Sequence, residues 1–273
     1  MKTLAAFLLC TAAAFSQDAA APDRVTVPFS DPSRPKTLRV GLINGGITVK
    51  GYDGKDAIVE ARPDSGSGKH RRDRAERTDG MRRIDMAGTG LVVEESDNVV
   101  KVGTRSVNEN VQLTIQVPFN TNLKLHTVNG GDIVVDHIVG DVELEDTNGA
   151  ITATHISGTA VVNALNGKVL VSLDKISGDK PMSFSSLNGD IDVTLPADMK
   201  AKVKLKTDNG AVYSDFDIQM DASARKPVVQ DSKSGNGRFK VQFDRAMYGL
   251  INGGGADMSL TTFNGNIYIR KAK

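Results

Sequence analysis

The chain has 273 residues, of which 39% are hydrophobic and 25% charged, a composition typical of a globular protein. Its 34 basic and 33 acidic residues leave a net charge of +1, which argues against a dedicated nucleic-acid-binding protein. Tryptophan is absent and only 5% of residues are aromatic, which argues against a large helical core or a sugar-stacking cleft. The 27 glycines, together with frequent valine, isoleucine and threonine, favour short strands joined by tight turns.

The first residues are organised as an export signal. Lys2 supplies a positive charge, residues 4–15 are apolar but too few to span a bilayer, and small residues precede an expected cleavage site before Gln17. We therefore predict a signal peptide over residues 1–16 and a protein that is periplasmic, or secreted to the cell surface. Cys10, the only cysteine, lacks the small preceding residues of a lipobox. We expect it to be removed with the signal, which leaves no thiol or disulfide.

Composition divides the rest of the chain into three parts. Residues 17–36 are rich in Ala, Asp, Pro and Ser and predict a flexible tether. Residues 37–117 alternate like β-strands around a polar insertion at 63–90, and residues 118–273 are periodic. Basic side chains concentrate in residues 69–83, where interspersed acidic residues favour a solvated loop; the alternative is a patch for an anionic surface. No later segment is apolar enough to cross a membrane.

Two turn patterns alternate through the periodic part. Asn-Gly suits tight turns because both residues tolerate positive φ. It recurs as Asn129-Gly130, Asn148-Gly149, Asn166-Gly167, Asn188-Gly189, Asn209-Gly210 and Asn264-Gly265. Ile-x-Gly recurs between these pairs, as Ile138–Gly140, Ile156–Gly158 and Ile176–Gly178. These spacings indicate a repeating unit of roughly 18–22 residues that contains two strands and two turns.

Aliphatic residues alternate along the strands between these turns. We expect the inward-pointing set to include Ile133, Val135, Val142, Leu144, Ile151, Ala153, Val169, Val171, Ile191 and Val193. A two-strand unit cannot bury this apolar face alone, so successive units are expected to stack about 4.8 Å apart. The fold predicted is an all-β single-stranded solenoid, or β-helix, built from these two-strand rungs. An antiparallel meander or sandwich is the alternative, although a meander does not explain why the turn type alternates.

The series of strands that follow Asn-Gly resembles a known bacterial family. The pattern Asn-Gly-x-[Ile/Val]-x-[Val/Ala] occurs at residues 148–153, 166–171, 188–193 and 264–269, and with one extra glycine at 129–135. With the preceding signal peptide, this series is similar to the DUF4097 β-strand repeat family of candidate adhesins, over roughly residues 38–271. The resemblance implies a β-solenoid-like fold and a surface or envelope role. It implies no catalytic residues.

Motifs for catalysis or cofactor binding are absent from the sequence. It contains no metalloprotease helix motif, nucleotide-binding loop, nucleophile elbow or zinc-spaced cysteine set. His137 and His155 lie one repeat apart and are expected to stack about 5 Å from each other. A two-histidine metal site lacks an evident third ligand. Four aspartates follow turn glycines, where calcium binding is the alternative to ordinary turn chemistry: Asp132, Asp141, Asp179 and Asp190.

These observations favour an exported, non-catalytic protein with a structural, adhesin-like or binding role at the cell envelope. We predict no catalytic, cofactor or metal site. The expected partner is an envelope or surface component, either protein or polysaccharide, and not nucleic acid. We do not expect the chain to span a membrane. Two alternatives stay open. A β-helical polysaccharide lyase or hydrolase would line one groove with carboxylates among Asp190, Asp192 and Asp208. A calcium-stabilised surface repeat would use the stacked aspartates.

Overall fold

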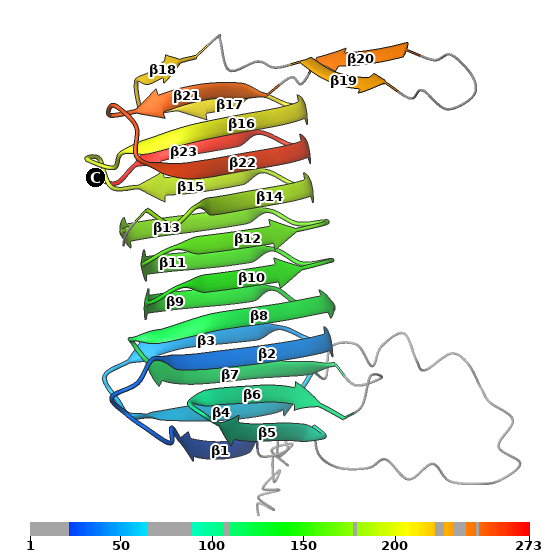
Figure 1. Cartoon of the computed structure of the whole chain (residues 1–273). Helices are drawn as coiled ribbons and strands as arrows, with labels where there is room; N and C mark the ends of the chain where they lie inside the picture. The colour runs from blue at the N-terminus through cyan, green and yellow to red at the C-terminus, as the bar shows by residue number, and fades with distance from the viewer. Residues whose placement is uncertain are drawn as a thin grey trace, which may run out of the picture.

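The computed structural model consists of β-strands connected by turns (Figure 1). It describes residues 22–64, 89–105, 110–176, 179–221, 227–231, 239–243 and 246–273. The basic segment 69–83 therefore lies outside the described residues. Within them no helix occurs, and two large sheets, which we call sheet A and sheet B, contain all but two of the 23 strands. The two others, β19 (Pro227–Asp231) and β20 (Phe239–Phe243), pair with each other.

Sheet A has ten strands. In spatial order they are β1 (Asp23–Pro28), β4 (Asp56–Pro63), β7 (Val111–Pro118), β3 (Ile47–Tyr52), β9 (Ile133–Val139), β11 (Ile151–Ser157), β13 (Val169–Lys175), β15 (Ile191–Leu195), β23 (Ile267–Lys271) and β17 (Val212–Ser214).

Sheet B has eleven strands. In spatial order they are β18 (Ile218–Met220), β21 (Met247–Ile251), β16 (Ala201–Asn209), β22 (Ala256–Asn264), β14 (Met182–Asn188), β12 (Ala160–Ala164), β10 (Val142–Asp146), β8 (Thr121–Asn129), β2 (Lys36–Asn44), β6 (Val99–Thr104) and β5 (Leu91–Ser96).

One strand from each sheet makes a rung, and the rungs stack in parallel register. Ile133 of β9 pairs with Ile151 of β11, which pairs with Val169 of β13. The turns of these rungs keep the same offset, since the stacked Asn148 and Asn166 are 18 positions apart in the chain. The next rung, which begins its sheet A strand at Ile191, is longer, and its Asn188 lies 22 positions after Asn166. The predicted β-solenoid and its rung length are thus confirmed, and parallel pairing through the middle of both sheets rules out the antiparallel meander.

The hydrophobic core fills the space between the two sheets. Every residue predicted to point inward is buried, and Ile133, Ile151, Val169 and Ile191 have no exposed surface at all. Phe184 is the largest fully buried side chain. Burial of apolar side chains between stacked rungs is the main stabilising contribution expected for such a fold.

The asparagines of the Asn-Gly turns form a column along one edge of the stack. The side-chain Nδ2 of Asn148 donates to Oδ1 of Asn129 at 2.7 Å, and Asn166 donates to Asn148 at 2.9 Å. The same bond continues from Asn188 to Asn166, from Asn264 to Asn188 and from Asn209 to Asn264. We call this the asparagine ladder. Each asparagine inside it satisfies one donor and one acceptor, which holds the turns of successive rungs in register.

Two rungs are placed out of chain order. The rung of β2 and β3 lies between β6–β7 and β8–β9, and the rung of β22 and β23 lies between β14–β15 and β16–β17 (Figure 1). Strands β2 to β7 therefore belong to the same stack as the strands that follow them in the chain. β1 pairs antiparallel with β4, so residues 23–28 of the predicted tether form a strand.

Candidate functional site

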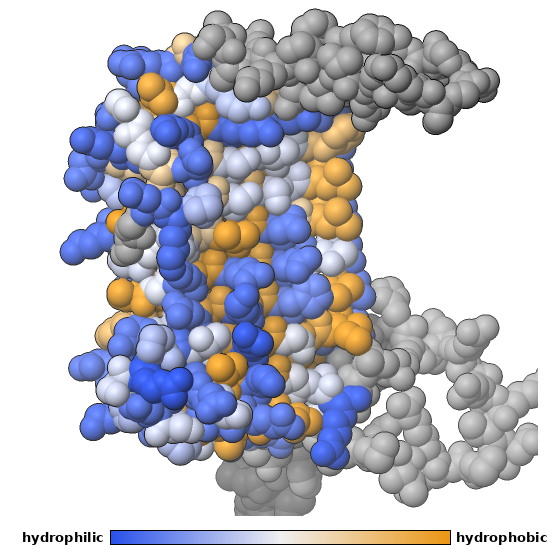
Figure 2. Space-filling view, viewed as in Figure 1, coloured by the Kyte–Doolittle hydropathy of each residue, from blue (hydrophilic) through white to orange (hydrophobic). Residues whose placement is uncertain are grey.

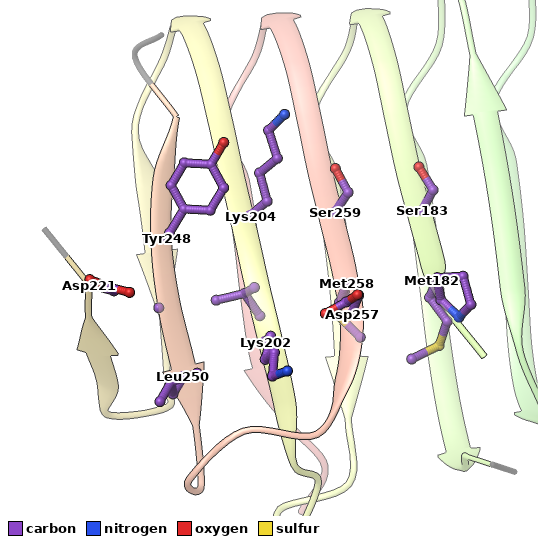
Figure 3. A pocket seen from close by; sticks show the side chains of 13 residues that line it. Met182, Ser183, Lys202, Lys204, Asp221, Tyr248, Leu250, Asp257, Met258 and Ser259 are labelled. Carbon is purple, nitrogen blue, oxygen red and sulfur yellow. The ribbon is translucent and has the colours of Figure 1, made fainter. Parts of the chain in front are cut away.

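A hollow of about 520 Å³ opens on the outer face of sheet B near the C-terminal rungs (Figure 3). It crosses four neighbouring strands, β14, β22, β16 and β21. The side chains that border it on the outer face are Pro181, Ser183, Lys202, Lys204, Asp221, Tyr248, Leu250, Asp257 and Ser259. Because alternate residues of a strand point to opposite faces, the apolar partners of these residues lie in the core.

Strand register arranges the polar lining in a row. Ser183 pairs with Ser259, Ser259 with Lys204, and Lys204 with Tyr248. The row therefore presents two hydroxyls, an ammonium and a phenol side by side across four strands. The Lys204 Nζ lies 6.0 Å from the centroid of the Tyr248 ring, at the outer limit of a cation–π contact. Such a row can donate and accept hydrogen bonds, and its tyrosine offers an apolar ring face.

Glycine at position 249 shapes the same end of the sheet. Gly249 is buried in the middle of β21, and a Cβ there would come within 2.5 Å of Cγ2 of Ile218. Because that contact is too close, glycine at this position lets β18 pair with β21 without displacing the Ile218 side chain. β18 and β21 both run antiparallel to their neighbours, and they cover the end of sheet B.

Tyrosines gather around these C-terminal rungs. Three of the chain's four tyrosines follow residue 212, and two of them stack on the outer face of sheet A. The rings of Tyr213 and Tyr268 have centroids 5.2 Å apart and an interplanar angle of 10°, and Tyr213 is 54% exposed. The Arg270 guanidinium lies 5.4 Å from the Tyr268 ring and donates two hydrogen bonds to Asp192, at 2.8 and 3.1 Å. The low total of aromatics hid this clustering from sequence reasoning.

Exposed apolar side chains accompany the asparagine ladder. Leu165, Leu187 and Phe263 each precede a ladder asparagine and are 43–47% exposed. Figure 2 shows hydrophobic residues along this edge of the stack. Each directly follows a buried residue, so the alternation of the strand itself turns it outward to solvent.

Comparison with known proteins settles the family. The Toastrack DUF4097 family model matches residues 108–246, which is just over half of the chain. The chain belongs to the Toastrack DUF4097 family. A search of curated proteins found no match for this Toastrack sequence.

Two solved structures show similarity to this Toastrack protein. A candidate cell adhesion protein of Clostridium sporogenes has 11% sequence identity and a TM-score of 0.47, and the match covers 92% of this chain and all of the other. A candidate adhesin of Bacteroides fragilis has 11% identity and a TM-score of 0.40, over 93% of this chain and 98% of the other.

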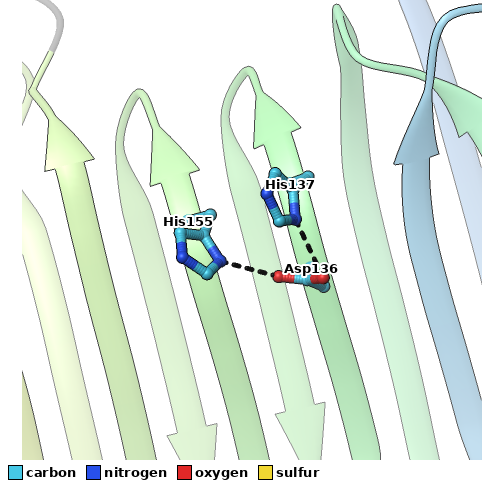
Figure 4. Close-up of side chains that lie close together, drawn as sticks. All are labelled: Asp136, His137 and His155. Carbon is cyan, nitrogen blue, oxygen red and sulfur yellow. Dashed lines mark hydrogen bonds and ion pairs between the residues drawn. The ribbon is translucent and has the colours of Figure 1, made fainter.

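A second polar cluster, of Asp136, His137 and His155, lies toward the C-terminal ends of β9 and β11 in the Toastrack stack (Figure 4). The rings of His137 and His155 stack with centroids 4.3 Å apart, which confirms the stacking predicted from their spacing. Both rings turn Nδ1 toward the carboxylate of Asp136, at 2.8 Å for His137 and 2.9 Å for His155. Thr154 Oγ1 also donates to Asp136, at 2.9 Å. Sequence reasoning found the two histidines and missed the aspartate.

Electrostatics at this cluster favour an ionised carboxylate. Burial raises the pKa of Asp136, but the hydrogen bonds from His155, His137 and Thr154 outweigh it and lower the pKa to about 2. The hydrogen bond to Asp136 raises the pKa of His155, and the charge of Asp174 on β13 adds to that effect. Asp136 is thus held as an anion between two imidazoles.

The carboxylates considered for calcium or for catalysis point to separate neighbours in the Toastrack stack. Asp132 accepts a hydrogen bond from the Ala150 amide at 2.8 Å, and Asp190 accepts one from the Asn266 amide at 2.7 Å. Asp141 instead accepts from Thr159 Oγ1, at 2.6 Å. Each therefore ties its turn to a neighbouring rung, whereas ordinary turn chemistry predicts a hydrogen bond within the turn itself.

The other three residues of those two sets also diverge. Asp192 accepts hydrogen bonds from the Arg270 guanidinium. Asp208 lies on β16 beside the end of the asparagine ladder. Asp179 lines a separate hollow together with Asp174 and Asp198. Asp190 and Asp192 thus bond to different neighbours, the Asn266 amide and the Arg270 guanidinium.

Proposed function

We propose that this Toastrack protein is exported and acts as a non-catalytic binding protein at the cell envelope or cell surface. It binds a protein or polysaccharide component of that surface through the outer face of its C-terminal rungs. The observation that carries the proposal is the hollow on sheet B, where Lys204 and Tyr248 stand beside two serine hydroxyls. Tyrosines that are partly exposed on rigid strands provide contact area at low entropic cost.

The chemistry of the lining supports binding rather than catalysis. Hydroxyl, ammonium and carboxylate groups occur there, but the bordering residues include no histidine or cysteine. Its polar groups lie in a row across the strands, and a catalytic site needs groups that converge on a reacting atom.

Export is supported by the N-terminal pattern of Lys2, the apolar stretch 4–15 and the small residues before Gln17. The part of the chain that the structure describes offers no apolar helix of membrane-spanning length. Fractionation of cells that make the full chain tests the proposal. We expect mature protein outside the cytoplasm with Gln17 as its first residue, and an unprocessed cytoplasmic protein would contradict export.

Binding is tested by retention on isolated envelope material. We expect the wild-type protein to be retained and the double variant Lys204→Ala, Tyr248→Ala to lose at least about tenfold in affinity, since aromatic and charged anchors dominate such surfaces. Lys124→Ala is the matched control, because Lys124 lies on the same outer face of sheet B, outside the hollow. Equal retention of the wild type and the double variant, or hydrolysis of an envelope polysaccharide, would contradict the proposal.

A further inference from the structure

Two β-bulges place the histidine cluster on the surface. Thr154 and His155 of β11 lie opposite a single residue of β13, Ser172, because the register shifts between the two strands. β9 carries the same extra residue, His137, in register with β11. The two bulge histidines adopt left-handed backbone φ angles of 54° and 56°. Few non-glycine residues adopt this conformation, so histidine at both bulges points to a role for the side chain.

The bulges bring three metal-ligating groups to one point. In a regular strand Asp136 and His137 would face opposite sides of the sheet, but the bulge turns both outward. One ligand atom from each of Asp136, His137 and His155 lies within 4.8 Å of the other two. Both histidine side chains are more than half exposed, which leaves room for the rings to rotate.

We propose that Asp136, His137 and His155 bind one divalent transition-metal ion such as Zn²⁺. Two imidazole nitrogens and a carboxylate oxygen are the ligand set that borderline ions prefer, and three protein ligands leave positions for water. Ligands of a tetrahedral zinc ion lie about 3.4 Å apart, given metal–ligand distances of about 2.1 Å. The present Nδ1-to-carboxylate distances, 2.8 Å from His137 to Oδ2 and 2.9 Å from His155 to Oδ1, are hydrogen-bond distances shorter than that spacing, so the ligand atoms move apart when the ion enters.

The ion takes the place of the shared protons between the rings and the carboxylate. Each imidazole binds through Nδ1, and its remaining proton resides on Nε2, which faces solvent; a ring that was protonated releases one proton to water. Thr154 keeps the carboxylate oriented through its hydrogen bond to Oδ1 of Asp136. Because His137 and His155 belong to successive rungs, the ion links β9 to β11 at the edge of the stack.

Zinc titration of the full chain, purified without a polyhistidine tag, tests the proposal by competition with a chromogenic chelator. We expect His137→Asn and His155→Asn each to weaken zinc binding at least about tenfold, and Asp136→Asn to weaken it similarly. Asparagine is chosen because it tolerates the left-handed backbone at both bulges. His126→Asn is the matched control, because His126 is also exposed and has its Nδ1 3.4 Å from the carboxylate of Glu145.

Nuclear magnetic resonance of the imidazole nitrogens in the wild-type protein supplies a readout that does not depend on variants. Zinc should shift the Nδ1 resonances of two histidines together, with one equivalent of metal. Unchanged affinity in the double variant His137→Asn, His155→Asn would overturn the proposal. Zinc shifts confined to Nε2, or to a histidine other than these two, would overturn it as well.

Discussion

Asp146 occupies an inward position where the neighbouring rungs have smaller or neutral residues. It pairs in register with Thr127 of β8 and Ala164 of β12, and it is only 1% exposed. Thr127 uses its hydroxyl to donate to the turn carbonyl of Gly45 at 2.9 Å. Among the described residues, Oδ2 of Asp146 has no hydrogen-bond partner. We expect Asp146→Thr to stabilise the fold, because it places a hydroxyl donor beside Thr127 and removes a buried carboxylate.

The size of the effect follows from the ionisation of Asp146. Burial raises its pKa from 3.8 to about 6, and the amides of Gly149 and Asn148 offset only part of this rise. The neutral acid is therefore favoured in the folded state, and ionising it above pH 6 costs about 3 kcal/mol, at 1.36 kcal/mol for each pKa unit. Threonine forfeits the hydrogen bond from the Asn148 amide, about 1 kcal/mol. The net gain at pH 8 is about 2 kcal/mol.

The pH dependence of the stability difference between variant and wild type tests this reasoning. Because the folded pKa lies above the unfolded one, the cost of Asp146 is absent below pH 4 and complete above pH 6. Urea unfolding of both proteins at pH 4, 6 and 8, followed by circular dichroism, should show the advantage of Asp146→Thr only at the higher values. Glu145→Thr, which changes an outward carboxylate on the same strand, is the control. A difference between variant and wild type that stays constant with pH would refute the reasoning.

Two further predictions concern the turns. Asn166→Ala removes one donated and one accepted hydrogen bond from the asparagine ladder, and urea unfolding should show a loss of about 1–2 kcal/mol. Gly167→Ala would place a Cβ 1.9 Å from the carbonyl oxygen of Gly149 on the rung beneath, and thermal unfolding should reveal a loss of about 3 kcal/mol. A Cβ at Gly41 meets nothing within 4 Å, so Gly41→Ala should stay within about 0.5 kcal/mol of the wild type; equal losses at both glycines would contradict close approach as the cause.

The repeat architecture could be predicted because its signals are local. Alternation at Ile133 and Val135, repeated one rung later at Ile151 and Ala153, specifies both the buried face and the length of a rung. The asparagine turns then have to form a column, because each Asn-Gly pair occupies the same place in its rung, just before the sheet A strand. These inferences need no knowledge of which rung lies above which.

The order of the rungs and the third member of the histidine cluster, Asp136, could not be predicted in this way. All rungs offer similar aliphatic faces. No local signal therefore indicates that β22 inserts between β14 and β16 instead of adding to the end of the stack. Alternation assigns Asp136 and His137 to opposite faces, and only the bulge brings them together. The register shift depends on strand pairing with β13, which the residues of β9 and β11 do not encode by themselves.

The inserted rung connects the topology of the stack to its binding surface. A parallel stack ends in exposed strand edges, and this protein covers the end of sheet B beyond β16 with the antiparallel strands β21 and β18. The hollow is assembled from β14, β22, β16 and β21, in which ladder neighbours lie 55 and 76 positions apart in the chain. Without β22, Ser183 and Lys204 would not flank a common row with Ser259. The proposed binding surface therefore requires the rung of β22 and β23 to lie in its place inside the stack, between β14–β15 and β16–β17.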